Sequence, residues 1–300
     1  MKILITGASG FIGSALVKKL QEEGHCVFTL VRKKGFCSNE IFWNPLEEKI
    51  EISKLLGFDA VVHLAGENIV GRWTDEKKKK IRESRILGTQ FLSKTLASLE
   101  KPPKVFLCAS AIGYYGNRGE ESLTEESQPG KGFLASVCQE WEKSSEPAQE
   151  KGIRVVHYRM GMVLSSQGGA LPKMLKLFKG GLGGKLSDGQ QWMSWISLVD
   201  LIEGILFCIQ HPSISGAMNA VAPNPVRNKE FTKILGEILH RPRFFSVPRF
   251  LLKLIMGEMA EEVLLTSTKV SQKKFTEAGF QFRFQDLRNT FQQLLNSKTS

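Results

Sequence analysis

The chain lacks an apolar run long enough to cross a bilayer, which excludes a membrane-spanning helix. It lacks internal repeats and low-complexity segments, which argues against a solenoid or a disordered protein. Cysteine is scarce, and none of the five scattered cysteines forms a C-x-x-C pair, so neither a disulfide framework nor a metal site is indicated. We therefore expect reduced thiols, no metal and a cytoplasmic protein.

Acidic residues are too few to balance the basic ones, and the formal net charge is +11. The densest basic cluster, Lys77–Lys80, lies on a predicted helix with no aromatic residues between the lysines. We interpret it as a solvated helix face and expect neither a nucleic-acid nor a membrane partner. A hydrophobic content of 42% in 300 residues is enough for a full core.

A glycine-rich segment, Thr6–Leu16, is the most informative part of the chain. It follows an apolar run, Ile3–Ile5, that starts two residues into the sequence, so we expect no signal or transit peptide. Strand, glycine turn and helix then follow in the order of a dinucleotide-binding unit. In this interpretation Gly7 allows the turn, Gly10 lets a pyrophosphate approach, and Gly13 lets the helix pack closely.

The second predicted strand, His25–Val31, indicates which dinucleotide binds. Arg32, Lys33 and Lys34 follow it, where an NAD-preferring site usually places an acidic residue on the ribose 2′-hydroxyl. An arginine at this point can pair with a 2′-phosphate. We therefore expect NADP(H) as cofactor, with Arg32 as the main contact; the alternative is a solvated basic turn.

Apolar runs and helical patterns alternate through the first two-thirds of the chain, with helices expected over 74–99 and 132–150. This alternation predicts an α/β, Rossmann-type doubly wound parallel sheet with a smaller, mostly helical C-terminal substrate region. We expect a cofactor domain over 1–165, to which residues 195–225 return. The substrate region then covers 166–300 and contains a small domain over 247–300.

Ligands of such sheets lie beyond the carboxyl ends of the strands. Four candidate positions follow predicted strands and should converge there: Gly7, Arg32, Ala65-Gly66 and Ser110. The expected cofactor-binding residues are Thr6, Gly7, Gly10, Phe11, Ile12, Gly13, Arg32, Lys33, Leu64, Ala65, Gly66, Arg85 and Ser110. Farther along, Trp192 and Trp195 lie beside glycine-rich stretches, and they indicate either a substrate cleft or a packed aromatic corner.

The chain resembles the short-chain dehydrogenase/reductase superfamily in Thr6–Gly13, in His63–Gly66 and in Ser110 followed by Tyr115-Gly116. Within its extended, epimerase/dehydratase-like branch, it is similar to the SulA-like epimerase family typified by bacterial YfcH. That narrower match rests on further segments and covers almost the whole chain, including a small extra C-terminal domain. The segments are 72–74, 84–85, 110–116, 141–142, 159–164, 195–196 and 248–295.

The resemblance implies catalysis by a tyrosine, a lysine four residues later, and a carbonyl-polarising serine. None of the three tyrosines has a lysine at that distance, and the usual positions hold Leu134 and Cys138. The candidate catalytic residues are therefore Ser110, Tyr114 and Tyr115. The tyrosines could equally be wall or packing residues, and Arg85 could replace the missing charge or bind an anionic substrate.

Two functions remain open. The chain is either an atypical NADP(H)-dependent oxidoreductase or epimerase of a small molecule, or a non-catalytic NADP(H)-binding regulator or scaffold linked to cell division. The first requires a proton donor other than the family tyrosine. A homodimer is compatible with either function.

Overall fold

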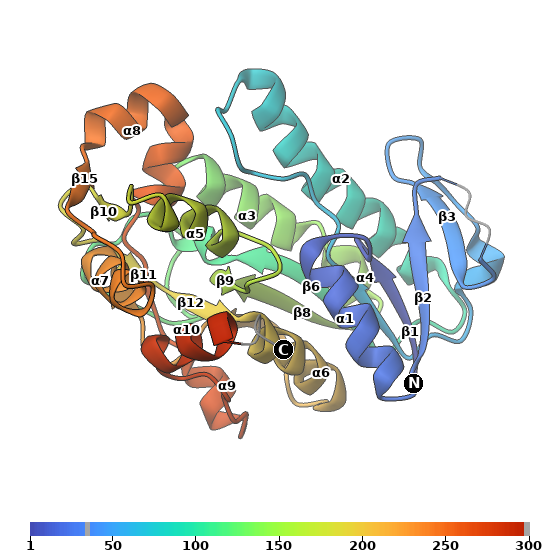
Figure 1. Cartoon of the computed structure of the whole chain (residues 1–300). Helices are drawn as coiled ribbons and strands as arrows, with labels where there is room; N and C mark the ends of the chain where they lie inside the picture. Colours follow the sequence, from blue (N-terminus) through green and yellow to red (C-terminus); the bar gives the residue numbers. More distant parts are fainter. Residues whose placement is uncertain (34–36, 297–300) are drawn as a thin grey trace.

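An eight-stranded sheet forms the centre of the protein in the computed structural model, which describes residues 1–33 and 37–296 (Figure 1). Lys34 lies outside the described residues. The strand order is β13-β8-β6-β5-β1-β2-β3-β4, and all neighbours are parallel except β3 and β4. The strands are β1 (Lys2–Thr6), β2 (Cys26–Val31), β3 (Glu40–Asn44), β4 (Lys49–Ile50), β5 (Ala60–His63), β6 (Val105–Ala111), β8 (Arg154–Met160) and β13 (Gly216–Ala220).

Helices cover both faces of the sheet, which confirms the doubly wound prediction (Figure 1). On one face are α1 (Phe11–Glu22) and α6 (Leu198–Gln210), and on the other α2 (Asp75–Ser98), α3 (Phe133–Lys143) and α4 (Glu146–Glu150). Alternate strand residues supply the two cores: Ile3 and Ile5 pack with α1 and α6, whereas Leu4 packs with α2 and α4.

The sheet changes direction between β1 and β5. The chain moves outward from β1 through β2 to β3, then crosses over to place β5 on the other side of β1. Ligands of open α/β sheets bind outside the carboxyl ends of the strands at such a switch point. Here the switch point lies between the glycine-rich loop after Thr6 and the segment that begins at Leu64.

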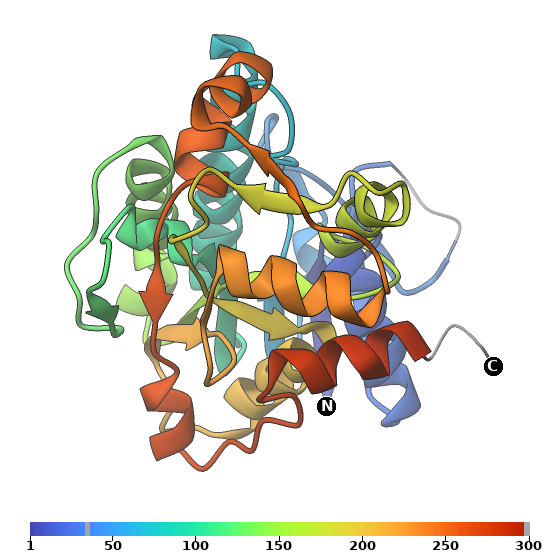
Figure 2. The same ribbon diagram turned by 60° about the vertical axis from the view of Figure 1, so that its left-hand side comes forward.

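A smaller region packs beside the carboxyl ends of the strands. Its core joins α5 (Leu171–Lys179), α7 (Asn228–Ile238) and α10 (Leu287–Asn296), and Figure 2 shows α7 and α10 side by side. The rest of this region consists of short elements: β7 (Ser122–Leu123), β9 (Met162–Leu164), β10 (Gly184–Leu186), β11 (Trp192–Met193), β12 (Trp195–Ser197), β14 (Val226–Arg227), β15 (Phe245–Val247), α8 (Arg249–Met256), the π-helical turn η3 (Ala260–Leu264), β16 (Lys269–Val270) and α9 (Lys273–Glu277). Two 3₁₀ turns belong to the sheet domain: η1 (Ile52–Leu55) precedes β5, and η2 (Ile112–Tyr115) follows β6.

The helix expected over 132–150 is divided in two. It ends at Lys143 and resumes at Glu146 as α4, with Pro147 in its first turn. The Ser145 hydroxyl donates to the Glu142 carbonyl and also contacts His157 Nε2, both at 2.7 Å. These local bonds compete with a continuous helix.

The N-terminus of α6 connects the two regions. The Ser197 hydroxyl accepts from the Asp200 amide and donates to the Asp200 carboxylate. That carboxylate is buried and also accepts the amides of Arg283 (2.8 Å) and Phe284 (2.9 Å). Asp200 therefore joins the sheet-covering helix to the C-terminal segment.

The two tryptophans have different environments. Trp195 is fully buried, and its indole N–H donates to the Asn224 carbonyl, which matches a packed aromatic corner. Trp192 is half-buried, and the cations of Arg227 and Lys269 lie 4.7 and 4.8 Å from its ring centroids. In the described part of the chain, no helix is both long and apolar enough to span a bilayer.

Candidate cofactor and active site

The glycine-rich loop is closed by contacts that only glycine permits. Gly7 has φ +70°, and a Cβ there would lie 2.9 Å from the backbone of Leu64 and Ala65. A Cβ on Gly13 would lie 2.1 Å from the Gly7 carbonyl oxygen. The loop thus fits tightly between the start of α1 and the end of β5. Gly13 packs on the loop itself.

Gly10 is the open position of the loop. It is exposed, and a Cβ there would meet only the Gly7 carbonyl oxygen, at 3.2 Å. The first bond of α1 runs from the Ser14 amide to the Gly10 carbonyl, so the preceding amides, those of Phe11, Ile12 and Gly13, begin the helix. The positive end of the helix dipole therefore meets solvent beside a residue without a side chain, which suits a pyrophosphate.

Thr6 connects the glycine-rich loop to the segment that follows β5. Its hydroxyl oxygen accepts the amides of Leu64 and Ala65, both at 3.1 Å, and lies 2.7 Å from His63 Nδ1. With both lone pairs engaged, the hydroxyl donates its proton to His63. Burial lowers the pKa of His63 to about 4, so the ring is neutral. His63 is not among the site residues predicted from the sequence. Its Nε2 is buried without a hydrogen-bond partner among the described residues.

Arg32 and Lys33 lie beside the glycine-rich loop. Thr6 pairs with Leu30, so the residues immediately after β2 continue alongside the loop that follows β1. Both side chains are exposed, and neither forms an ion pair with any residue that the structure describes. They are free to meet an anion at the end of β2.

A loop from the smaller region packs on the start of α1. A Cβ on Gly168 would lie 2.4 Å from the Phe11 ring, and one on Gly169 would lie 3.0 Å from it. This glycine pair follows β9 and precedes α5. Nothing in the local sequence indicates that the pair reaches Phe11.

The turn after Ser110 and the helix that carries Leu134 and Cys138 lie in contact, as the resemblance implies, but their side chains are not the expected catalytic ones. The turn η2 packs on α3, where a Cβ on Gly113 would lie 3.4 Å from Leu134 Cβ and 3.9 Å from Cys138 Sγ. Burial raises the pKa of the Cys138 thiol to about 12, so it is neutral. A leucine and a neutral thiol therefore face η2, and neither supplies a proton donor or a cation.

Arg85 places a positive charge close to Cys138. Its Nη1 donates to the carbonyls of Glu67 and Ile81, both at 3.0 Å, and its guanidinium would lie 3.4 Å from a Cβ on Gly66. The charge lies close enough to the Cys138 thiol to favour its ionised form, as does that of Arg159. Arg85 thus lies between the segment after β5 and Cys138.

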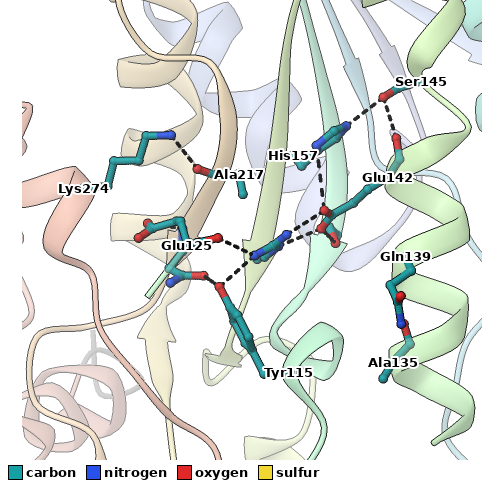
Figure 3. A network of polar contacts seen from close by, with 12 residues as sticks. Tyr115, Glu125, Ala135, Gln139, Glu142, Ser145, His157, Ala217 and Lys274 are labelled. Atoms are coloured by element: carbon teal, nitrogen blue, oxygen red, sulfur yellow. Dashed lines mark hydrogen bonds and ion pairs between the residues drawn. The ribbon is translucent and has the colours of Figure 1, made fainter. Parts of the chain in front are cut away.

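Ser110 belongs to a buried polar network around Glu142, of which Figure 3 shows Glu142, His157 and Tyr115. Its hydroxyl donates to Glu142 Oε1 at 2.7 Å, and Arg159 donates to both oxygens of the same carboxylate at 2.8 Å. The side chain is fully buried. The serine hydroxyl is thus turned toward α3 and its carboxylate.

The two tyrosines of η2 differ sharply. Tyr115 is fully buried, and its hydroxyl donates to Asn219 (2.7 Å) and accepts from Arg159 (2.9 Å); burial raises its pKa to about 12. Tyr114 is half-buried, with the Arg159 guanidinium 3.6 Å from its ring centroid. No hydrogen bond of the Tyr114 hydroxyl occurs among the described residues. Of the two phenols, Tyr114 has the hydroxyl that is free to meet a substrate.

A carboxylate from the smaller region caps α3. Glu262 accepts the amides of Phe133 (3.2 Å) and Leu134 (3.1 Å). Gly132 has φ +112°, and a Cβ there would lie 2.2 Å from the Glu262 carboxylate. The C-terminal segment therefore fixes the helix that carries Leu134 and Cys138.

The lysine run on α2 is paired with acidic residues. Lys77 binds Glu67, Lys78 binds Glu258 across to the C-terminal segment, and Lys80 binds Glu76. Among the described residues, no group of three or more His, Cys, Asp or Glu side chains is arranged to hold a metal ion.

Comparison with known proteins matches this architecture. Residues 3–220 match the model of the NAD dependent epimerase/dehydratase family, and residues 247–294 match a domain of unknown function, DUF1731. Epimerase family protein ML0860 of Mycobacterium leprae is 41% identical over 281 residues, which cover 93% of this chain and 91% of that protein.

Two solved structures are similar. One, of human epimerase family protein SDR39U1 (isoform 2) with NADPH, has a TM-score of 0.91 at 31% identity and covers 99% of both chains. The other, of a Corynebacterium glutamicum nucleoside-diphosphate sugar epimerase, has a TM-score of 0.82 at 39% identity, over 97% of this chain and 57% of that one. The resemblance inferred from the sequence is thereby confirmed, and the chain belongs to the NAD dependent epimerase/dehydratase family.

Proposed function

We propose that this protein binds NADP(H) and acts as an atypical oxidoreductase or epimerase on a small molecule. The observation that carries the proposal is the glycine-rich loop at the switch point, followed at the end of β2 by two cations that form no ion pair with any described residue. The human relative solved with NADPH supports the choice of cofactor.

The residues present fit such a cofactor. Gly10 and the amides at the start of α1 would hold the pyrophosphate, and Arg32 with Lys33 would hold a 2′-phosphate. Leu64, Ala65 and Gly66 would line the opposite wall. The bound nicotinamide would supply hydride transfer.

The protein's own part is proton transfer and orientation. Tyr114 is the proton donor of this proposal, because its hydroxyl is free and its ring lies on a guanidinium. Arg85 would stabilise negative charge near Cys138. Ser110 would orient the site through Glu142, to which its hydroxyl is bonded.

One observation favours the second candidate, an NADP(H)-binding regulator without turnover. Leu134 and Cys138 occupy the two positions where the family has its tyrosine and lysine, and Ser110 and Tyr115 have their hydroxyls engaged internally. A cofactor-binding loop combined with these replacements would suit a protein that binds the cofactor without carrying out a reaction.

Cofactor titration followed by an activity screen tests the proposal. We expect NADPH to bind at least about tenfold more tightly than NADH, because a charge-assisted pair contributes on the order of 1.5–3 kcal/mol. Arg32→Ala removes this preference, while Lys104→Ala, an exposed lysine at the start of β6, leaves it unchanged. Equal affinities in the wild type would refute the cofactor assignment.

An activity assay distinguishes the enzyme from the regulator. NADPH oxidation is followed against a panel of small carbonyl compounds and nucleotide sugars. Turnover that Tyr114→Phe abolishes supports the enzyme. Tight NADPH binding without turnover on any member of the panel favours the regulator.

A further inference from the structure

An apolar surface on the smaller region is turned toward solvent. It consists of Phe244, Phe245, Phe250, Leu254 and Ile255, which we call the α8 surface. Phe244 is 90% exposed, Phe250 71% and Leu254 69%. Clusters of large exposed apolar side chains on a soluble protein mark a site of contact with a protein or a membrane.

Unlike an ordinary surface helix, α8 has apolar side chains on both its inward and its outward face. Leu252 is buried and Met256 packs on the cluster around Trp73, so these two residues form the inward face. At 100° per residue, Phe250 and Leu254 lie on the opposite side of the helix. In both views α8 lies at the outer edge of the molecule (Figures 1 and 2), so the apolar face meets solvent.

Cations surround this surface. Residues 240–256 contain Arg241, Arg243, Arg249 and Lys253 and no acidic residue. The neighbouring stretch 171–186, whose β10 pairs with β15, adds four lysines and again no acidic residue. Glu261 is paired with Arg249 and Lys253, and Glu237 with Arg243, whereas Arg241 and the four lysines of 171–186 form no ion pair among the described residues.

We propose that the α8 surface docks on an anionic lipid bilayer. Exposed aromatic and leucine side chains flanked by Lys and Arg are the chemistry that inserts into the headgroup region of such a membrane. A second copy of the chain fits less well, because a two-fold contact would bring the same cations together. This surface revises the expectation of no membrane partner: the protein lies on the bilayer without spanning it.

Flotation of the full-length protein with vesicles tests the proposal. We expect binding to vesicles of phosphatidylcholine with about one-third phosphatidylglycerol, weaker binding at high salt, and none to pure phosphatidylcholine. Phe250→Ser/Leu254→Ser should lower the vesicle-bound fraction at least about tenfold, because two large apolar side chains no longer insert. Arg241→Gln/Lys253→Gln should lower it about tenfold.

Matched controls keep the outcome clear. Leu46→Ser/Leu56→Ser removes two exposed leucines from the opposite end of the sheet, and Lys18→Gln/Lys104→Gln removes two exposed lysines; both should bind vesicles like the wild type. Failure of the wild type to float with anionic vesicles overturns the proposal. A dimer in light scattering that Phe250→Ser/Leu254→Ser dissociates, without vesicle binding, makes a second copy of the chain the occupant.

Discussion

Glu142 and Arg159 form a two-point ion pair in the interior of the protein, with Arg159 Nε donating to one carboxylate oxygen and Nη2 to the other, each at 2.8 Å. The pair joins α3 to β8 and orients the Ser110 hydroxyl. The cost of removing both charges from water offsets much of their Coulomb attraction, so the main effect of the pair is to fix the geometry of the site. Removing one partner is costly because the other charge stays buried.

Glu142→Gln should therefore lower the free energy of unfolding by about 3–5 kcal/mol. The control is Glu76→Gln, which breaks the exposed pair with Lys80 and should leave the free energy of unfolding nearly unchanged, because solvent screens the pair. Urea unfolding of the three proteins checks both expectations. Equal losses for the two variants would mean that Arg159 finds another partner or solvent.

The glycine loop predicts opposite outcomes for two neighbouring glycines. Gly10→Val should fold and fail to bind dinucleotide, because the position is open in the protein but close to the expected pyrophosphate. Gly13→Ala should unfold or melt at a markedly lower temperature, because its Cβ would meet the Gly7 carbonyl. Thermal melts and NADPH titration distinguish the two; normal NADPH affinity in a folded Gly10→Val places the phosphates elsewhere.

His63 predicts a pH dependence of stability. Its pKa is lowered from 6.5 to about 4 by burial, so below pH 6.5 the unfolded chain takes up a proton that the folded protein does not. Stability is complete above pH 6.5 and falls as the pH is lowered toward 4. The loss due to His63 between pH 7.5 and pH 5 is about 2 kcal/mol.

The His63→Gln variant isolates this contribution. Urea unfolding of wild type and variant is measured at both pH values, and the wild type should lose about 2 kcal/mol more than the variant. Other titrating groups, including His157, whose pKa burial also lowers, cancel in the comparison. Parallel losses would show that His63 is not the group that titrates.

Turnover, once a substrate is found, should depend on Tyr114 and Ser110 and not on Cys138. Tyr114→Phe should lower kcat by about 10²–10⁴, the usual effect of losing a positioned proton donor. Tyr115→Phe should instead lower stability, because it leaves a buried Asn219 oxygen without its donor. Cys138→Ser should keep kcat within a few-fold of the wild-type value. Full activity of Tyr114→Phe would show that Tyr114 is not the proton donor.

Local sequence predicted the glycine loop and the parallel sheet, because both follow from short patterns and from the alternation of strands and helices. The Glu142 network was not predictable, because it depends on the register of β6 with β8 and on the rotation of α3. Nor was the capping by Glu262, whose partners lie far away in the sequence. The break at Ser145 had a local cause in Pro147, which the pattern of apolar residues concealed.

The hydrogen bonds of Asp200 make the start of α6 depend on the C-terminal part of the chain. Its carboxylate lies at the start of α6, yet two of its partners are amides 83 and 84 residues further along the chain. Every strand of the eight-stranded sheet precedes these amides in the sequence. A truncated chain that ends before Arg283 would therefore contain the whole sheet but leave the buried Asp200 carboxylate at the start of α6 without two of its hydrogen-bond donors.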